Sequence, residues 1–408
     1  MSDVKIFTSQ RIRLDAVCSE SELNYRPDEK CGAALDIPGL NGLALRSLVT
    51  LFDNKARLFS RAMTFDKNGA SHRQEASQKR TIIALLGLHR LKTSGETIPF
   101  DVSSICDVVL GDTSWVRSLE DLGLLTWFIA DCEPDRLTNL FSEFDFENAL
   151  GMYSDGRKGY TRALAWFLAG IAHARMVCPR SFPDLTDIAV ETYHSLEENQ
   201  SERSGFFGHA AGSRLAQHLI CSQYGTFGDQ IHPIYALTVF AKAFQVEEPL
   251  ASALSCGNAI RALQGELGQW WFLYDKRSGR VVNRYPVFCL HQDGTAPVGL
   301  LSLAEATGQS FYDPIYRGLS WIMGTNELGQ DVRNKERTMI WDSIQRRRRL
   351  PKYWEIAHSL VHVPCGLRSD QLNVCYGARP DHFGWLLYAF GKQGLPTTRF
   401  TGNALAAG

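Results

Sequence analysis

The sequence predicts an all-α domain, an α/α toroid in which an outer ring of helices encloses an inner ring of buried ones, with one small β-hairpin inserted. Two observations lead to this prediction. Short segments that are apolar on nearly every side recur along the chain, which is typical of helices buried on several sides. Amphipathic segments alternate with them at intervals of about 40 to 70 residues, as expected for two concentric layers of helices.

The helical segments follow one another from residue 42 onwards. Residues 42–62 and 75–92 carry leucine, isoleucine and phenylalanine at helical spacing. The buried segments expected in the inner ring are residues 122–130, 161–174, 233–244, 296–306 and 382–390. The more amphipathic segments, expected in the outer ring, include residues 184–198 and 248–264. Strand signals are few, and the clearest is a hairpin at residues 270–285 with Gly279 in its turn.

The chain shows no sign of a division into several domains. No low-complexity run and no tract rich in Pro, Ser or Gly marks a linker. We therefore expect one large repetitive domain at residues 41–395, with an N-terminal extension at residues 1–40 and a C-terminal tail at residues 396–408.

The composition is that of a globular protein and argues against several partners. Hydrophobic residues make up 44% and charged residues 21% of the chain, and the net charge is −1, so neither nucleic acid nor an anionic membrane is expected as a partner. The longest apolar run, residues 163–177, contains His173 and Arg175 and is too short to span a bilayer. Early charges argue against a signal peptide, and the 10 cysteines lack disulfide spacing, so a cytoplasmic protein is expected.

One short motif carries a resemblance to a known group of proteins. Residues 264–270 read Gln-Gly-Glu-Leu-Gly-Gln-Trp and fit the pattern Q-x-x-x-G-x-W. A glutamine can bond to free backbone groups at a helix end, a glycine permits a tight turn, and a tryptophan can stack over that turn. Together with the alternating helices, this motif makes the chain resemble the terpenoid cyclase and protein prenyltransferase toroid group, whose cyclases repeat the QW motif.

The resemblance implies a toroid enzyme with its chemistry in a central cavity. It does not extend to the acidic motifs of the group. The chain has neither D-x-D-D, the protonating acid of class II cyclases, nor D-D-x-x-D, the metal–diphosphate cluster of class I synthases. It also has no P-loop, no G-x-G-x-x-G after a strand and no G-x-S-x-G, so ATP, dinucleotide and serine-hydrolase chemistry are not expected.

Polar residues just before the inner helices are the candidate site, because in a toroid these positions face the cavity. The richest such segment places His291, Gln292 and Asp293 before a buried helix. Asp293 could accept or deliver a proton, and His291 could share that work. For Asp293, the alternative to catalysis is a role as a helix N-cap.

Two further segments offer the same types of residue. Asp229 is a second candidate acid or base, with a capping turn as the alternative. Arg379 could hold a phosphate or carboxylate in bidentate fashion. The substrate-binding residues predicted in this way are Gln230, His232, Trp271, Tyr285, Gln292, Arg379, Asp381 and His382.

The C-terminal part of the chain holds the best candidate for a metal site. His358 and His362 are spaced so that one helix face would present both, and Cys365 and Cys375 follow. The segment Cys-Tyr-Gly at residues 375–377 resembles a zinc-ligating segment of the lanthionine cyclases, although their Cys-His-Gly segment is absent here. Zinc or another divalent metal is therefore a candidate cofactor, with hydrogen-bonded core histidines as the alternative.

The function expected first is that of a terpenoid-cyclase-like isomerase or lyase, using acid–base catalysis on an isoprenoid or similar apolar small molecule. The alternative is a carbohydrate-active toroid enzyme, either a lyase, an epimerase or a glycosidase, because Tyr, His, Arg and Trp around a cavity suit a glycan. A dry apolar pocket would favour the isoprenoid, and an open polar groove the glycan. A non-catalytic helical scaffold is a third hypothesis, under which the candidate segments would face separate surfaces.

Overall fold

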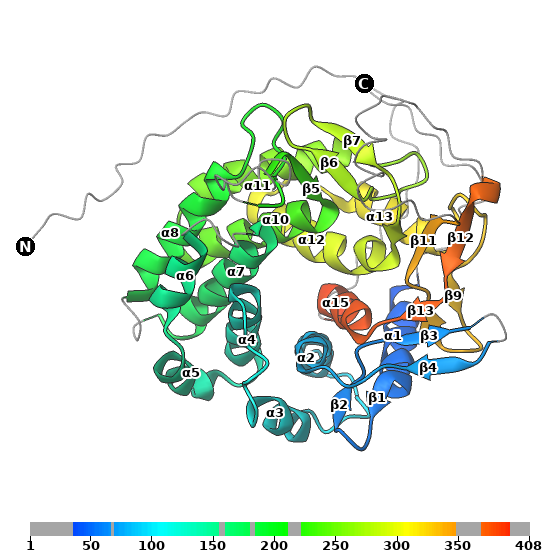
Figure 1. Cartoon of the computed structure of the whole chain (residues 1–408), viewed down its shortest axis with the longest axis horizontal. Helices are drawn as coiled ribbons and strands as arrows, with labels where there is room; N and C mark the ends of the chain where they lie inside the picture. Colours follow the sequence, from blue (N-terminus) through cyan, green and yellow to red (C-terminus); the bar gives the residue numbers. More distant parts are fainter. Residues whose placement is uncertain are drawn as a thin grey trace, which may run out of the picture. The chain divides into compact units, whose positions relative to one another are not determined.

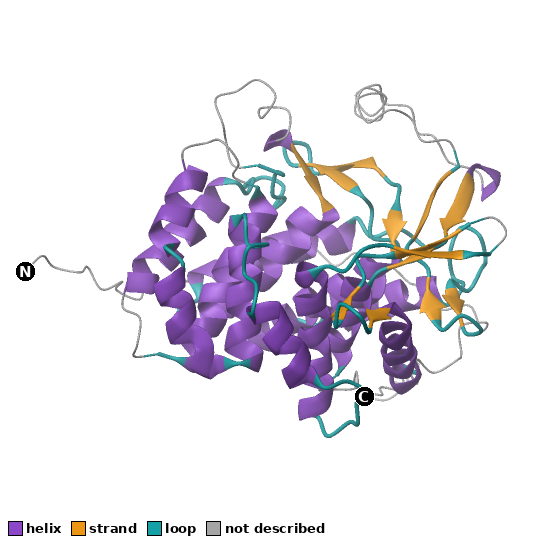
Figure 2. Ribbon diagram, turned by 60° about the horizontal axis from the view of Figure 1, so that its bottom comes forward, coloured by secondary structure: helices purple, strands orange, loops and turns teal. Residues whose placement is uncertain are grey.

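The computed structural model of the chain describes residues 36–66, 69–154, 160–179, 184–210, 222–347 and 369–391, all of which lie in the unit Leu35–Gly408. Within these residues, the elements of residues 78–198 are all helical, and the short strands come before and after this stretch (Figure 1). Figure 2 shows the helices packed together, with most of the strands gathered to one side of them.

The inner ring consists of helices that each pack against the next in chain order (Figure 1). In the described part of the chain they are α2 (Gln78–Thr93), α4 (Leu119–Cys132), α7 (Thr161–Val177), α10 (Phe227–Phe244), α12 (Ala296–Thr307) and α15 (Pro380–Phe390). Helix α15 packs against α2, so the ring closes. Nearly every residue of α4, α7 and α10 is buried, as the apolar segments predict.

The outer helices pack on the outside of this ring, each against at least one inner helix. They are α1 (Ile37–Leu51), α3 (Val102–Leu110), α5 (Leu137–Glu143), α6 (Phe146–Ser154), α8 (Asp184–Glu198), α11 (Glu248–Ala262) and α13 (Tyr312–Ile322). Short helical turns are η2 (Pro134–Arg136), η4 (Ser369–Gln371) and the π-helical η3 (His291–Thr295), which runs directly into α12. The predicted α/α toroid is thus confirmed.

The structure contains more β-structure than the single hairpin that the sequence predicts. That hairpin is present as β6 (Leu273–Asp275) and β7 (Arg280–Asn283), and β5 (Tyr224–Thr226) adds a third strand to it. The other strands are β1 (Phe52–Asp53), β2 (Leu58–Phe59), β3 (Met63–Phe65), β4 (Ser71–Arg73), β8 (Val287–Phe288), β9 (Arg333–Asn334), β10 (Met339–Ile340), β11 (Ser343–Arg346), β12 (Leu372–Cys375) and β13 (Gly377–Ala378). Strands this short do not show the alternation by which a strand is recognised in a sequence.

The first predicted helix ends earlier than expected. Residues 42–62 were expected to be helical, but α1 stops at Leu51, and Phe52 pairs with Phe59 in a small antiparallel hairpin. The Asp53 carboxylate accepts hydrogen bonds from the backbone N–H groups of Lys55 and Ala56, which forms the turn. An Asp that bonds to the backbone two and three residues onward favours a turn over a helix.

The QW segment forms a turn between α11 and the hairpin. Gln264 Nε2 donates to the carbonyl oxygens of Gly268 (3.0 Å) and Pro314 (2.8 Å), so it ties the turn to α13. Gly268 has φ +96°, a conformation that favours glycine. Trp270 is fully buried and stacks on Phe227 at the start of α10.

Two pairs of inner helices approach closely because glycines face each other. A Cβ on Gly87 of α2 would collide with the backbone of Gly384 in α15, and a Cβ on Gly170 of α7 would collide with the backbone of Gly123 in α4. These contacts hold the inner ring tightly closed at two positions.

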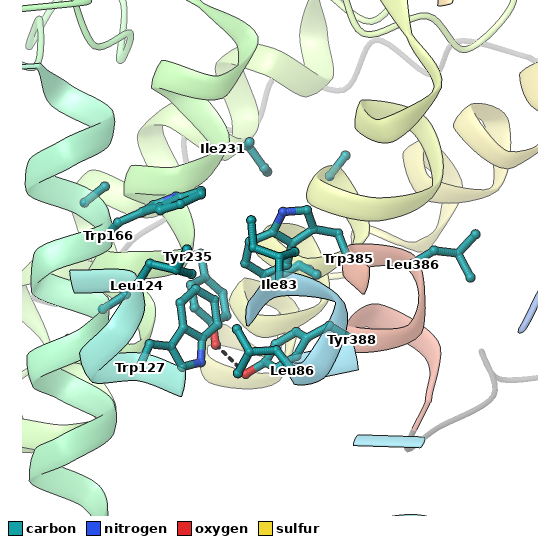
Figure 3. Close-up of a cluster of buried hydrophobic side chains, with 14 of the residues drawn as sticks. Ile83, Leu86, Leu124, Trp127, Trp166, Ile231, Tyr235, Trp385, Leu386 and Tyr388 are labelled. Atoms are coloured by element: carbon teal, nitrogen blue, oxygen red, sulfur yellow. Dashed lines mark hydrogen bonds between the residues drawn. The ribbon is translucent and has the colours of Figure 1, made fainter. Parts of the chain in front are cut away.

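The centre of the inner ring is filled by side chains. Figure 3 shows Trp127, Trp166, Tyr235, Trp385 and Tyr388 meeting there from four of the inner helices. Trp127 contacts the rings of Tyr235, Trp385 and Tyr388, with 4.8 to 5.3 Å between the ring centroids. In the described part of the chain, no helix is long and apolar enough to cross a bilayer.

Candidate active site

The N-terminal ends of the inner helices bring polar and aromatic side chains together in what we call the N-terminal cluster. Its members are Lys79, Arg80, Glu120, Arg162, Trp166, His232, His291, Asp293, Asp381, His382 and Trp385. They come from five inner helices, α2, α4, α7, α10 and α15, and, for His291 and Asp293, from the η3 turn that leads into α12. The site is therefore built by the closure of the ring, not by one local segment.

Ion pairs join neighbouring helices around this end. Lys79 Nζ lies 2.8 Å from Glu120 Oε1, and the Arg162 guanidinium contacts the same carboxylate at 3.2 Å. Arg80 pairs with Asp381, which links the first inner helix to the last. Burial works to raise the pKa values of Glu120 and Asp381, but these cationic partners hold both below their usual range.

A buried Asp–His pair forms the innermost part of the cluster. His382 Nε2 lies 2.7 Å from Asp293 Oδ1, and both side chains are almost completely buried. Burial raises the pKa of Asp293, and the neighbouring His382 opposes that rise. Asp293 lies within the π-helical turn η3, and π-helical turns are frequent at functional sites. The pair fixes the orientation of the His382 ring.

Two further imidazoles, His232 and His291, are only partly buried and so can be reached by a ligand. Burial lowers the pKa of His232 to about 3, and the positive charge of Arg162 lowers it further. Burial, His232 and Arg379 together lower the pKa of His291 to about 3. Both rings are therefore neutral at physiological pH. The Nδ1 atom of His291 is buried and has no hydrogen-bond partner in the described part of the chain.

Two tryptophans flank the imidazoles. The ring of Trp166 lies edge-on to His232, with 5.2 Å between the ring centroids, and 6.0 Å from that of Trp385. The Lys79 ammonium lies 5.5 Å from the centroid of the Trp166 ring, within reach of a cation–π interaction. Among the described residues, the Trp166 indole N–H has no acceptor. Buried donors and acceptors of this kind leave hydrogen-bonding capacity for a polar ligand.

The structure brings some of the sequence-predicted residues together. His232, His291, Asp293, Asp381 and His382 all lie in the N-terminal cluster. Arg379 lies next to it, 3.0 Å from Asp342, and its charge acts on both Asp381 and His291.

The other predicted residues have local partners instead. Asp229 is part of a capping box with Thr226 and lies 2.9 Å from His209 Nδ1. This cap starts α10 at Phe227, so Asp229 and His232 lie inside the helix and not in a loop before it. Gln230 accepts a hydrogen bond from the Phe207 N–H and donates one to its carbonyl, which ties α10 to a neighbouring segment.

The remaining predicted contacts belong to the QW turn and the hairpin. In the amide orientation that satisfies both of its side-chain atoms, Gln292 donates to the Gly268 carbonyl and accepts from the Trp270 N–H. Trp271 lies beneath the Arg284 guanidinium, and the Tyr285 hydroxyl donates to Glu327 at 2.7 Å. The following predicted residues thus have mainly structural partners: Asp229, Gln230, Trp271, Tyr285 and Gln292.

Sequence reasoning missed the polar residues at the starts of the first three inner helices. Lys79, Arg80, Glu120 and Arg162 occupy the opening turns of α2, α4 and α7. The rule that led to His291 and Asp293 applies equally to these positions. Charged side chains are mostly exposed in proteins, so at a helix start they do not by themselves indicate a site.

The predicted metal site falls mostly outside the described residues, which do not include His358, His362 and Cys365. Cys375 lies in β12, opposite Ser343 of β11. Within the described residues, no group of three or more His, Cys, Asp and Glu side chains could hold a metal ion. The zinc hypothesis stays a prediction.

Comparison with known proteins gives a clear result at the level of fold. No protein-family model and no curated protein sequence matches the chain. A sugar epimerase from a ruminal bacterium is similar in structure, with a TM-score of 0.59 at 10% identity, over 88% of this chain and 100% of that one. A possible GH105 family member from Klebsiella pneumoniae gives a TM-score of 0.57 at 10% identity, over 94% of this chain and 98% of that one. An unsaturated glucuronyl hydrolase from Streptococcus agalactiae gives a TM-score of 0.54 at 12% identity, over 87% of this chain and 90% of that one.

These similarities confirm the α/α toroid and correct the function that was expected first. The expectation of a terpenoid-cyclase-like enzyme of isoprenoid biosynthesis was wrong, because the structures that share this fold are described as enzymes of carbohydrates. The physical reason lies in the N-terminal cluster, which is rich in charges and imidazoles and is not a dry apolar pocket. The QW resemblance is a match in one turn and is not tested by these comparisons.

Proposed function

We propose that the protein is a carbohydrate-active enzyme that isomerises or epimerises a reducing sugar by proton transfer at the N-terminal cluster. The observation that carries this proposal is the presence of three imidazoles, His232, His291 and His382, from three different inner-helix segments. The structural similarity to a sugar epimerase supports it.

Imidazoles suit this chemistry. The hydrogen on C2 of an open-chain sugar is acidic because it lies next to the carbonyl group, and a positioned base can remove it. His382, oriented by Asp293, is the best candidate for that base. Neutral His232 and His291 can donate hydrogen bonds to the carbonyl oxygen as negative charge develops on it. Return of the proton to the other face of C2 gives the epimer, and its return to C1 gives the ketose.

The carboxylates of the cluster favour proton transfer over hydrolysis. Glycoside hydrolysis uses two carboxyl groups, one of them protonated, on either side of the scissile bond. Here Glu120 and Asp381 are each engaged by cations that keep them ionised, and Asp293 is fully buried against His382. None of these three is free to act as a solvent-accessible acid.

The charge balance supports an uncharged sugar as the substrate. Lys79, Arg80 and Arg162 each lie in an ion pair with a carboxylate of the cluster. In the described part of the cluster, no arginine or lysine is left over to bind a uronate or a phosphate. The tryptophans Trp166 and Trp385 can pack against the apolar face of a sugar ring.

The proposal is tested by incubating the protein with glucose, mannose and cellobiose and following the products by NMR. We expect a C2 epimer or a ketose to form. The His291→Asn and His382→Asn variants should each lose most of this activity, roughly 100-fold or more. The His194→Asn variant, on an exposed position of the outer helix α8, should keep it.

Hydrolysis is the second candidate, because an unsaturated glucuronyl hydrolase is among the proteins that share this fold. An unsaturated uronyl disaccharide serves as its test substrate. Cleavage of this compound, without conversion of any free sugar, would replace the proposed function by hydrolysis.

A further inference from the structure

A second polar pocket lies at the opposite end of the inner ring. It has a volume of about 1090 Å³ and is lined by residues of α2, α7, α10, α12 and α15, most of them in the C-terminal halves of these helices. Arg90, His173 and Tyr235 are among its lining residues. Tyr235 of the aromatic packing in Figure 3 lines this pocket, whereas Trp166 and Trp385 of the same packing belong to the N-terminal cluster. We call it the C-terminal pocket.

A closed circuit of hydrogen bonds runs through the floor of this pocket. Asp131 Oδ1 lies 2.7 Å from His173 Nδ1, and His173 Nε2 lies 2.9 Å from the Tyr235 hydroxyl. The Tyr235 hydroxyl lies 3.0 Å from that of Tyr388 (dashed in Figure 3), which donates back to Asp131 Oδ2 at 3.2 Å. Each member of the circuit is thus linked to two others.

The circuit is one proton short when His173 is neutral. Burial works to raise the pKa of Asp131, but His173, Arg90 and the indole N–H of Trp127 hold it low, so Asp131 is an acceptor only. The two tyrosines supply one hydrogen each, since burial raises their pKa values, and a neutral His173 supplies one more. Four contacts then share three hydrogens, and a proton on His173 completes the circuit.

Arg90 is a fixed cation beside this circuit. Its guanidinium stacks 3.9 Å from the centroid of the Tyr388 ring and donates to the Tyr388 carbonyl oxygen at 2.7 Å. Within the described residues, it forms no ion pair with a carboxylate, because the oxygens of Asp131 are already engaged by His173, Trp127 and Tyr388. A guanidinium held in place with unused donors is prepared to bind an anion in bidentate fashion.

The other charges of the pocket lie at its rim, where Lys242 offsets one of the two carboxylates, Glu247 and Glu305. Lys242 pairs with Glu305 at 3.4 Å, and both side chains are well exposed, so water screens them. Glu247 is also exposed. The walls between rim and floor include the apolar side chains of Val239 and Val298.

We propose that the C-terminal pocket is a second ligand site, which binds a small organic carboxylate by pairing it with Arg90 beside a protonated His173. The apolar walls would pack against the carbon skeleton of the ligand. This proposal is independent of the reaction at the N-terminal cluster. A bound anion favours the proton on His173, so binding should tighten as the pH falls. The charged and titratable groups that face His173 are Asp131, Tyr235, Tyr388 and Arg90.

Trp127 provides a direct signal for binding. Its indole stacks on the His173 ring, with 4.9 Å between centroids and 19° between planes. The protein is titrated with gluconate at pH 6 and pH 8 while tryptophan fluorescence is followed. We expect saturable binding that is tighter at pH 6. We expect no binding of glucose, which has a similar carbon skeleton but no charge, and the fluorescence change should be lost in the Trp127→Phe variant.

Substitutions inside and outside the C-terminal pocket test whether gluconate binds there. Arg90→Gln should weaken gluconate binding by about tenfold or more. Ser302→Phe, which fills the pocket from α12 without changing Arg90, should also weaken it. Arg333→Gln, which alters a cation elsewhere on the protein, should leave it unchanged. The proposal would be overturned if glucose or inorganic phosphate bound as tightly as gluconate. It would also be overturned if Arg90→Gln and Ser302→Phe both left the affinity for gluconate unchanged.

Discussion

Asp293 and His382 show how individual residues acquire roles that their sequence positions only suggest. Sequence reasoning gave Asp293 the role of acid or base and His382 that of substrate contact. The structure buries both side chains and places Asp293 Oδ1 2.7 Å from His382 Nε2, so in our proposal Asp293 acts through the His382 ring. Asp293 is therefore a positioning residue, and in our proposal the proton transfer falls to His382.

The Asp293→Asn variant tests this division of roles. The amide can still contact His382, but it has no charge to stabilise a protonated ring, so kcat should fall roughly 100-fold or more. KM should change little, because in our proposal the residue acts on the His382 ring and not on the substrate. Asp313→Asn, on an exposed position of α13, is the matched control. Wild-type kcat in Asp293→Asn, with its fold intact by circular dichroism, would contradict the assignment.

At the scale of helices and strands, the sequence predicted the inner helices best. Their apolar character arises from burial on several sides, which leaves a pattern that can be read directly. Helix starts were harder to predict. Pro233 reads as a first helical residue, but the capping box at Thr226 and Asp229 sets the start of α10 before it. A cap depends on two side chains and backbone geometry, and an Asp or Thr in a sequence does not reveal whether it caps or catalyses.

The close approach of α2 and α15 makes a prediction about one glycine. In Gly384→Ala the new methyl group would meet the backbone of Ile83 and Ala84, so the free energy of unfolding should fall by about 1–3 kcal/mol. Gly151→Ala, in the outer helix α6 with open space around it, should instead stabilise the protein by about 0.5–1 kcal/mol. Urea unfolding of both variants measures the difference. A neutral Gly384→Ala would mean that the two helices pack less tightly than described.

At the scale of the whole ring, the site depends on contacts that no local pattern encodes. His382 near the end of the chain meets Asp293, and Arg80 near its beginning meets Asp381. The spacing of three polar segments before inner helices predicted that they share a cavity, but not which of their residues face each other. The circuit of Asp131, His173, Tyr235 and Tyr388 was not expected at all, because its members are spread over four apolar helices.

The central claim is that the N-terminal cluster moves a proton on a reducing sugar, and isotope exchange tests it most directly. The reaction is run in D₂O with a sugar that the protein converts, and the product is examined by NMR. Proton transfer to and from the solvent predicts deuterium on C2 of an epimer or on C1 of a ketose, and no such deuterium with His382→Asn. A product without deuterium at that carbon, or deuterium uptake that is unchanged in His382→Asn, would contradict the account.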